Sequence, residues 1–358
     1  MKKILVMMII GVIMLTGCAI KSPATDVIET VDITTIESLK NDEVILPEVE
    51  MDVSTETIFP ETESEEILEE TIQEETDILE PELPPIPTYK IIDMELGGRD
   101  ITTYGDFPEE FVFNLESMLD AYPKNISLAV YSLDGSRAMV YNGNQQYFSA
   151  CTVKIPWMLY LCQEIDAGRV DKDTVITYEE KHYHKGSGSI RKGSYGDTYT
   201  IEQLINLCLS ISDNVAYEML VQEVIDRNDF YEFLEQFEFD RFQIPSYSIW
   251  CSNAIPTDFL MIWEGVYEYF KTETTGSKIL KTACTNTQWN YGTATLQDYD
   301  YSHKSGDNWE PNAAHNDAGI VWAETPYLYA IFTKSEGNDY DERNIDAVMG
   351  LVHEEFCK

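Results

Sequence analysis

Residues 147–156, Tyr-Phe-Ser-Ala-Cys-Thr-Val-Lys-Ile-Pro, decide how this chain is interpreted. Cys151 lies three residues before Lys154, so on a helix the two side chains share one face and are one turn apart. A nucleophile at the start of a helix gains from the helix dipole, and a thiol beside a lysine is well placed to ionise. The pair Cys151 and Lys154 is therefore singled out as a candidate for nucleophilic chemistry. Ser149 lies off this face and cannot replace Cys151 in the same register.

Two further motifs follow in order along the chain. Ser212-Asp213-Asn214 ends an apolar helical segment, and Lys304-Ser305-Gly306 lies on a late predicted strand. With the segment 151–154, these motifs resemble the S-x-x-K, S-D-N and K-[ST]-G set of class A β-lactamases and penicillin-binding proteins. The resemblance covers about residues 100–358.

The resemblance implies a catalytic role for the matching residues. Cys151 stands at the position of the family's nucleophile, and Lys154 is the proton acceptor. The hydroxyl of Ser212 would relay a proton to the departing β-lactam nitrogen. The backbone N–H groups of Cys151 and Asp307 would form an oxyanion hole. A mechanism of this kind needs no cofactor and no metal ion.

The other matches are implied to bind the substrate. Asn214 would hold the substrate amide, while Lys304 and Ser305 would bind the substrate carboxylate. Gly306 and Asp307 would complete that strand of the site. The implied partner is a β-lactam or the stem peptide of peptidoglycan.

Two residues of the expected site differ from the family pattern. Cys151 replaces a serine, and because sulfur is bulkier than oxygen, an oxyanion geometry set for oxygen can be spoiled. Ala318 stands where the family has a cationic partner for the substrate carboxylate. One interpretation of these changes is a fold that kept its core and lost its chemistry.

The residue that would activate water for deacylation also differs. Residues 239–243, Phe-Asp-Arg-Phe-Gln, are similar to the start of the loop that carries the deacylating glutamate of class A enzymes. Gln243 stands at the position of that glutamate, and a glutamine cannot accept a proton. Glu235 and Glu238 are nearby alternatives for the base.

Three functions are therefore considered. The preferred one is a β-lactamase-like hydrolase that acts on β-lactams through a covalent acyl-enzyme at Cys151. The second is a D,D-peptidase or penicillin-binding wall enzyme, which would need no loop glutamate. The third is a catalytically silent module that binds a cell-wall ligand.

The order of apolar patterns predicts an α+β domain over residues 89–358, with a mainly helical middle. Together with the resemblance, it predicts a β-lactamase-like, five-stranded antiparallel sheet built from both ends of the domain. Strands are expected at residues 126–131, 138–141, around 303–304, 319–322 and 327–333. Thr200 and Gln203 predict a capped helix that starts at Ile201, and a helix is expected to close the chain at 345–356.

The first eighteen residues predict export and a membrane anchor. Lys2 and Lys3 form a basic start, residues 4–15 are apolar, and Leu15-Thr16-Gly17-Cys18 ends the segment. This pattern resembles a bacterial lipoprotein signal in which Cys18 carries the lipid; the alternative is an ordinary secretory signal. We therefore expect an extracytoplasmic protein, lipid-anchored to the bacterial cell membrane.

Residues 19–88 predict an acidic, disordered tether. They hold seven of the chain's 14 prolines, no glycine and 21 acidic residues against two basic ones. Such a segment has too few large apolar groups to offset its chain entropy, and its like charges keep it extended.

The overall charge excludes one class of function. The chain carries 64 acidic and 24 basic residues and a formal net charge of −40. A field of this sign repels a phosphate backbone, so we expect no nucleic-acid partner. We expect a monomer.

The remaining cysteines and histidines give little further chemistry. The six cysteines after Cys18 show no short C-x-x-C unit, so neither zinc binding nor disulfides are expected. His182 and His184 could form a metal pair, but no third ligand is evident. His315 either orders the edge of the site or caps a turn.

Overall fold

The computed structural model describes residues 101–121, 126–246, 248–250, 252–288, 295–309, 312–335 and 339–358. The predicted signal segment 1–18, with Cys18, and the predicted tether 19–88 lie outside the described residues. Among the described residues, no helix is both long enough and apolar enough to cross a membrane.

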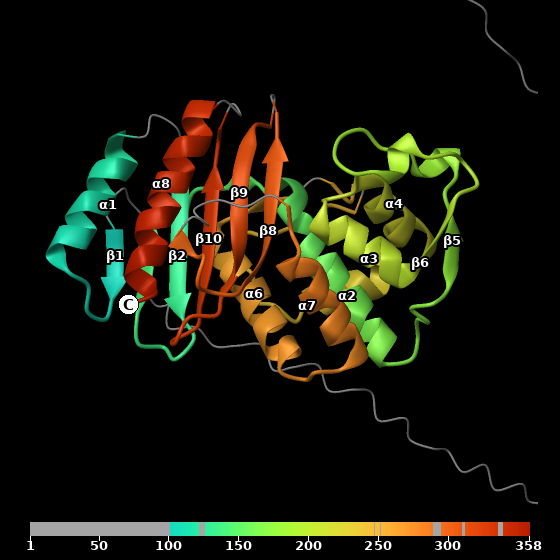
Figure 1. Ribbon diagram of the computed structural model, residues 1–358, viewed down its shortest axis with the longest axis horizontal. Coiled ribbons are helices and arrows are strands. Elements are labelled where there is room, and N and C mark those ends of the chain that lie inside the picture. The colour runs from blue at the N-terminus through green and yellow to red at the C-terminus, as the bar shows by residue number, and fades with distance from the viewer. Residues whose placement is uncertain are drawn as a thin grey trace, which may run out of the picture. The chain divides into compact units, whose positions relative to one another are not determined.

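An antiparallel sheet is the centre of the domain (Figure 1). Its strand order is β1-β3-β2-β10-β9-β8, so strands from both ends of the domain lie side by side. The five predicted strands are present, and a sixth, β1, pairs with β3 at the edge. The predicted count of five was therefore one strand short, because β1 holds only four residues and no alternating pattern marks it. The bounds are β1 Ile101–Tyr104, β2 Ile126–Ser132, β3 Ala138–Tyr141, β8 Tyr301–Asn308, β9 Ala314–Val321 and β10 Tyr327–Thr333.

Helices cover the sheet on both faces. Helices α1 (Glu109–Ala121) and α8 (Asp339–Phe356) pack on one face, where Leu115, Leu119, Val348 and Val352 join the buried core. The opposite face carries α6 (Pro256–Phe270) and α7 (Thr275–Thr285). Both ends of the described domain supply strands and helices to the sheet and its covering, so the middle of the domain is left to form a separate helical layer.

The middle of the chain is mainly helical, as predicted. Its elements are the short helices η2 (Ala150–Val153), η3 (Glu180–His182) and η4 (Ile190–Lys192), the helices α2 (Lys154–Asp166), α3 (Ile201–Ser210), α4 (Asn214–Glu223) and α5 (Arg227–Leu234), and the strand pairs β4 (Tyr147–Phe148) with β7 (Asn253–Ala254) and β5 (Val175–Thr177) with β6 (Thr198–Thr200). Buried aromatic rings hold this layer together, and Trp157 stacks on Phe230 with ring centroids 3.5 Å apart.

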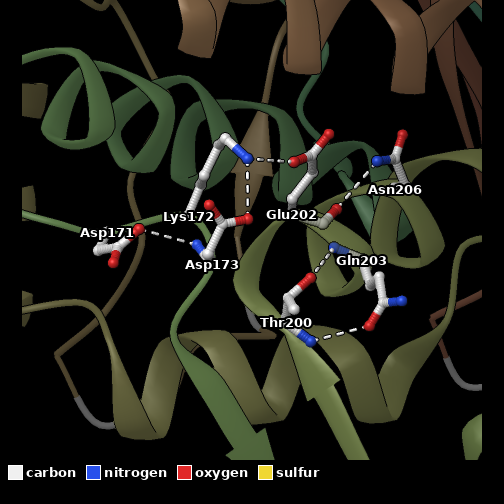
Figure 2. A network of polar contacts seen from close by, with 7 residues as sticks. All are labelled: Asp171, Lys172, Asp173, Thr200, Glu202, Gln203 and Asn206. Carbon is white, nitrogen blue, oxygen red and sulfur yellow. Dashed lines mark hydrogen bonds and ion pairs between the residues drawn. The ribbon is translucent and has the colours of Figure 1, made fainter.

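The start of α3 confirms the predicted capping box (Figure 2). The backbone N–H of Gln203 donates to Thr200 Oγ1 at 3.2 Å, and the N–H of Thr200 donates to Gln203 Oε1 at 2.9 Å. Beside it, Lys172 forms ion pairs with Asp173 and Glu202. These contacts fix the helix whose far end leads into the Ser212 motif.

Candidate active site

Cys151 lies in η2, directly before α2 begins at Lys154. The backbone of Ala150 is left-handed, with φ at 49°, and this bend aims the following residue out of the core. Cys151 is partly exposed, whereas Ser149 is fully buried and its hydroxyl contacts that of Ser252. The nucleophile position is thus occupied by the thiol, and the Ser149 hydroxyl is engaged with another loop.

Lys154 joins the first motif to the second. Its side chain is fully buried, and its Nζ donates to Ser212 O at 2.8 Å, to Asn214 Oδ1 at 2.9 Å and to Ser212 Oγ at 3.3 Å. Asp213 O lies 3.5 Å from the same Nζ. Among the described residues, no carboxylate oxygen lies within hydrogen-bond distance of this ammonium group.

Asp213 holds the second motif in place. It is fully buried and caps α4, because its Oδ1 accepts hydrogen bonds from the N–H groups of Val215 (2.9 Å) and Ala216 (3.1 Å). Its Oδ2 accepts from the N–H groups of Ser189 (2.6 Å) and Ile190 (2.9 Å). One carboxylate therefore ties the loop before η4 to the helix that begins beside Ser212 and Asn214.

A glycine allows this loop to come close. Gly188 has φ at +111°, and a Cβ added there would lie 2.2 Å from Asp213 Cγ. Asn214 is held by the same loop: its Nδ2 donates to Lys185 O at 2.7 Å, and its backbone N–H donates to Ser187 O at 3.1 Å.

The third motif lies on β8, directly beside η2. A Cβ added to Gly306 would lie 2.8 Å from the backbone nitrogens of both Cys151 and Thr152, so only glycine fits here without a shift of that backbone. Lys304 is buried, and its Nζ donates to Ser305 O at 2.6 Å. The three sequence motifs therefore meet at Cys151.

Two ammonium groups set the charge state of the nucleophile. Burial raises the pKa of the Cys151 thiol, but Lys154, Lys304 and a hydrogen bond with Ser212 lower it, and the net pKa lies below the usual value of 9.0. The pKa of Lys304 is also lowered, mainly by burial, although Cys151 acts in the opposite direction. These charges therefore shift the thiol toward the thiolate, which is the nucleophilic form of cysteine.

Asp307 and His315 form the end of the site on β8 and β9. The two residues are opposite each other in the register, and His315 Nδ1 lies 2.9 Å from Asp307 Oδ1. This contact places His315 at the edge of the site, as one of its two interpretations expected. The Asp307 carboxylate raises the pKa of Cys151, in opposition to the lysines.

Gln243 lies in a different environment from the other predicted residues. Its side chain is exposed, and its backbone N–H donates to Asn253 O at 3.4 Å. It lines a separate cavity together with Glu235, Phe148 and Ser252. Within the described part of the chain, no hydrogen bond joins its side chain to Cys151 or Lys154.

Ala318 is opposite Lys304 on β9 and is fully buried. It therefore supplies no cation to the site.

The structure adds an aromatic wall that the sequence analysis missed. Trp250 and Tyr217 place their rings 5.5 and 5.6 Å from Lys154 Nζ. His184 stacks on Trp250 with centroids 4.2 Å apart, and its Nδ1 is 3.3 Å from Asn214 Nδ2. These residues come from separate loops and α4, so no local sequence pattern could have joined them.

The two histidines considered as a metal pair do not act together. His182 is buried and contacts Glu223 at 2.9 Å, while His184 lies against Trp250. The described residues contain no group of three or more potential ligands that could hold a metal ion. Each histidine has a protein partner that accounts for its position.

The comparisons with known proteins identify the family and the fold. The model of the Beta-lactamase enzyme family matches residues 111–354, more than half of the chain, and the chain belongs to this family. The β-lactamase VEB-1 of Pseudomonas aeruginosa is 22% identical over 174 residues, which are 48% of this chain and 56% of that protein. The match therefore spans only about half of this curated relative.

Solved structures share the fold. PBP-A is 19% identical with a TM-score of 0.62, and the match covers 71% of this chain and 99% of that one. A variant of PBP-A was solved as an acyl-enzyme complex with penicillin G. It is 18% identical to this chain with a TM-score of 0.62, and the match covers 70% of this chain and 98% of that one. The predicted β-lactamase-like, α+β fold is confirmed.

Proposed function

We propose that the protein is an acyl-transfer enzyme of the β-lactamase type that opens β-lactams at Cys151. The observation that carries the proposal is the meeting of Cys151 with two buried lysines, which lower the pKa of its thiol. The thiolate attacks the lactam carbonyl, a carbon–sulfur bond forms, and the carbon–nitrogen bond of the ring breaks. The departing nitrogen takes a proton through the hydroxyl of Ser212, which lies 3.3 Å from Lys154 Nζ.

Release of the acyl group is expected to be slow. Hydrolysis of the thioester needs a base to activate water. The groups around Lys154 Nζ are a hydroxyl, an amide, carbonyl oxygens and aromatic rings, and the Asp307 carboxylate at the end of the site contacts His315. Gln243 cannot supply this base. This environment favours the second candidate function, a penicillin-binding enzyme that acts on peptidoglycan stem peptides, over rapid β-lactam hydrolysis.

Intact mass after treatment with penicillin G tests the proposal. We expect one adduct of the mass of the intact antibiotic, mapped to the peptide that contains Cys151 and lost in Cys151→Ala. A chromogenic cephalosporin then separates the two enzymatic functions, since sustained turnover indicates a β-lactamase and a stable adduct indicates a penicillin-binding enzyme. An unmodified protein would contradict both and favour a silent module that binds a cell-wall ligand.

We also propose that the protein is exported and anchored to the cell membrane through a lipid on Cys18. The support is the basic, apolar and small-residue order of residues 1–18. We expect Cys18→Ser protein to leave the membrane fraction, whereas Cys357→Ser, which changes a cysteine at the far end of the chain, should stay there. Full membrane partitioning of Cys18→Ser would contradict the anchor.

A further inference from the structure

A cavity lies beside the segment that carries Cys151. Its volume is about 800 Å³, within the range of small-molecule sites. It is bounded by Gln146 and Phe148 before η2, by residues 231–245, and by Ser252 and Asn253 around β7. Because Ser252 also contacts Ser149, one wall of the cavity supports the backbone that leads to Cys151.

Four amide side chains line this cavity. Gln146, Gln243, Asn253 and Asn312 are all exposed. Within the described residues, none of these amide groups makes a side-chain hydrogen bond to another protein group, although other surface amides, such as that of Asn206, do. Each one offers both N–H donors and a carbonyl acceptor. The cavity therefore presents several donor–acceptor pairs that the protein itself does not use.

Aromatic side chains form part of the cavity lining. Phe148, Tyr231 and Phe239 line it and are partly exposed. Phe239 stacks on Phe237 with centroids 5.1 Å apart and meets Phe242 edge-on at the same separation. Flat rings held by such packing give a preformed apolar surface for a ligand to lie against.

The charges at the cavity balance. Arg241 and Glu235 both line it and are both exposed, so it carries one group of each sign. An anionic or a cationic ligand would meet one attractive and one repulsive charge there, so these two groups favour neither sign of ligand charge. Amides beside aromatic rings suit a ligand with hydroxyls on its edge and C–H groups on its face, which is a sugar ring.

We propose that this cavity binds a neutral saccharide that carries acetamido groups, an N-acetylhexosamine chain. An acetamido group offers one N–H and one C=O that point in opposite directions, so each can form a hydrogen bond with a different Gln or Asn side chain of the cavity. Its methyl group lies against the phenyl rings. Sugar binding here does not require chemistry at Cys151, so the proposal stands apart from the proposed function.

Ligand-observed NMR on the full chain tests the proposal, with the trimer of β-1,4-linked N-acetylglucosamine as the probe. We expect saturation transfer that is strongest at the acetamido methyl groups, and much weaker transfer to cellotriose, which lacks them. The double variant Gln146→Ala with Asn312→Ala should bind the trimer at least about fivefold more weakly, because the hydrogen bonds from two side-chain amides are lost. Both residues are exposed, so the fold is expected to persist, and the midpoint of thermal unfolding checks this.

The matched control is Gln236→Ala, which removes an exposed amide next to the cavity lining and should leave the affinity unchanged. Cys151→Ala should bind the trimer with the same affinity as the unchanged protein. Loss of acylation and loss of sugar binding can therefore be distinguished. The proposal is overturned by absent binding, by equal binding of cellotriose, or by an equal loss in Gln236→Ala. A neutral tetrapeptide that binds in place of the trimer would also overturn it.

Discussion

Replacement of Lys154 by methionine is expected to slow acylation of Cys151 by penicillin G at least about a hundredfold, the usual effect of removing an acid–base group. The buried ammonium group is one of the two charges that lower the pKa of the thiol, so its loss should raise that pKa and reduce the thiolate at neutral pH. Intact mass measured over time gives the acylation rate. Alkylation by iodoacetamide across a pH series gives the thiol pKa, and its midpoint should move upward.

Lys172→Met is the matched control for this variant. Lys172 forms ion pairs with Asp173 and Glu202 away from the three motifs, so its removal should change neither the acylation rate nor the alkylation midpoint. The midpoint of alkylation can be measured even if penicillin G forms no adduct. An unchanged midpoint in Lys154→Met would show that this lysine does not act on the thiol.

Asp213→Ala is expected to have the largest effect on stability, a loss of about 3 kcal/mol or more in the free energy of unfolding. The carboxylate accepts hydrogen bonds from the N–H groups of Val215, Ala216, Ser189 and Ile190. Alanine would leave these buried donors without an acceptor. Urea unfolding of the variant and the unchanged protein measures the difference.

Asp226→Ala provides the comparison, because Asp226 also caps a helix. It accepts from the N–H groups of Asn228 (2.8 Å) and Asp229 (3.5 Å), but these contacts are exposed. Its loss should cost only about 1 kcal/mol, the typical value for a helix cap. Equal losses for the two variants would show that Asp213 is no more than a cap.

The sequence was a good guide where chemistry depends on short spacing. Cys151 and Lys154 are one helical turn apart, and the residues of the second and third motifs are consecutive, so local geometry determines how each group is presented. The alternation of residues 126–131 likewise predicted β2, and strands were also expected at the positions of β3 and β10. The meeting of the three motifs at one site was predicted from the family resemblance, not from any local pattern.

The parts that were missed depend on contacts between distant segments. Trp250, His184 and Tyr217 meet beside Lys154 although they lie on separate elements, and no spacing rule connects them. Gln243 was assigned from five residues of a loop, yet the structure pairs its backbone with Asn253 and places the residue in the lining of a cavity that does not include Cys151. Loop paths are set by packing, which a short sequence match does not contain.

The central strand pair also governs how the domain is made. β2 pairs with β10, so Ile126 is the partner of Thr333, although most of the domain's sequence lies between them. During synthesis at about 5–20 residues per second, β2 waits about 10–40 s for its partner to emerge. Over that interval the strand edge that will pair with β10 is open to other chains. All seven residues of β2 are buried in the folded domain, so they are exposed during this wait. The nascent chain therefore passes through an aggregation-prone stage that ends only when the last strand is released.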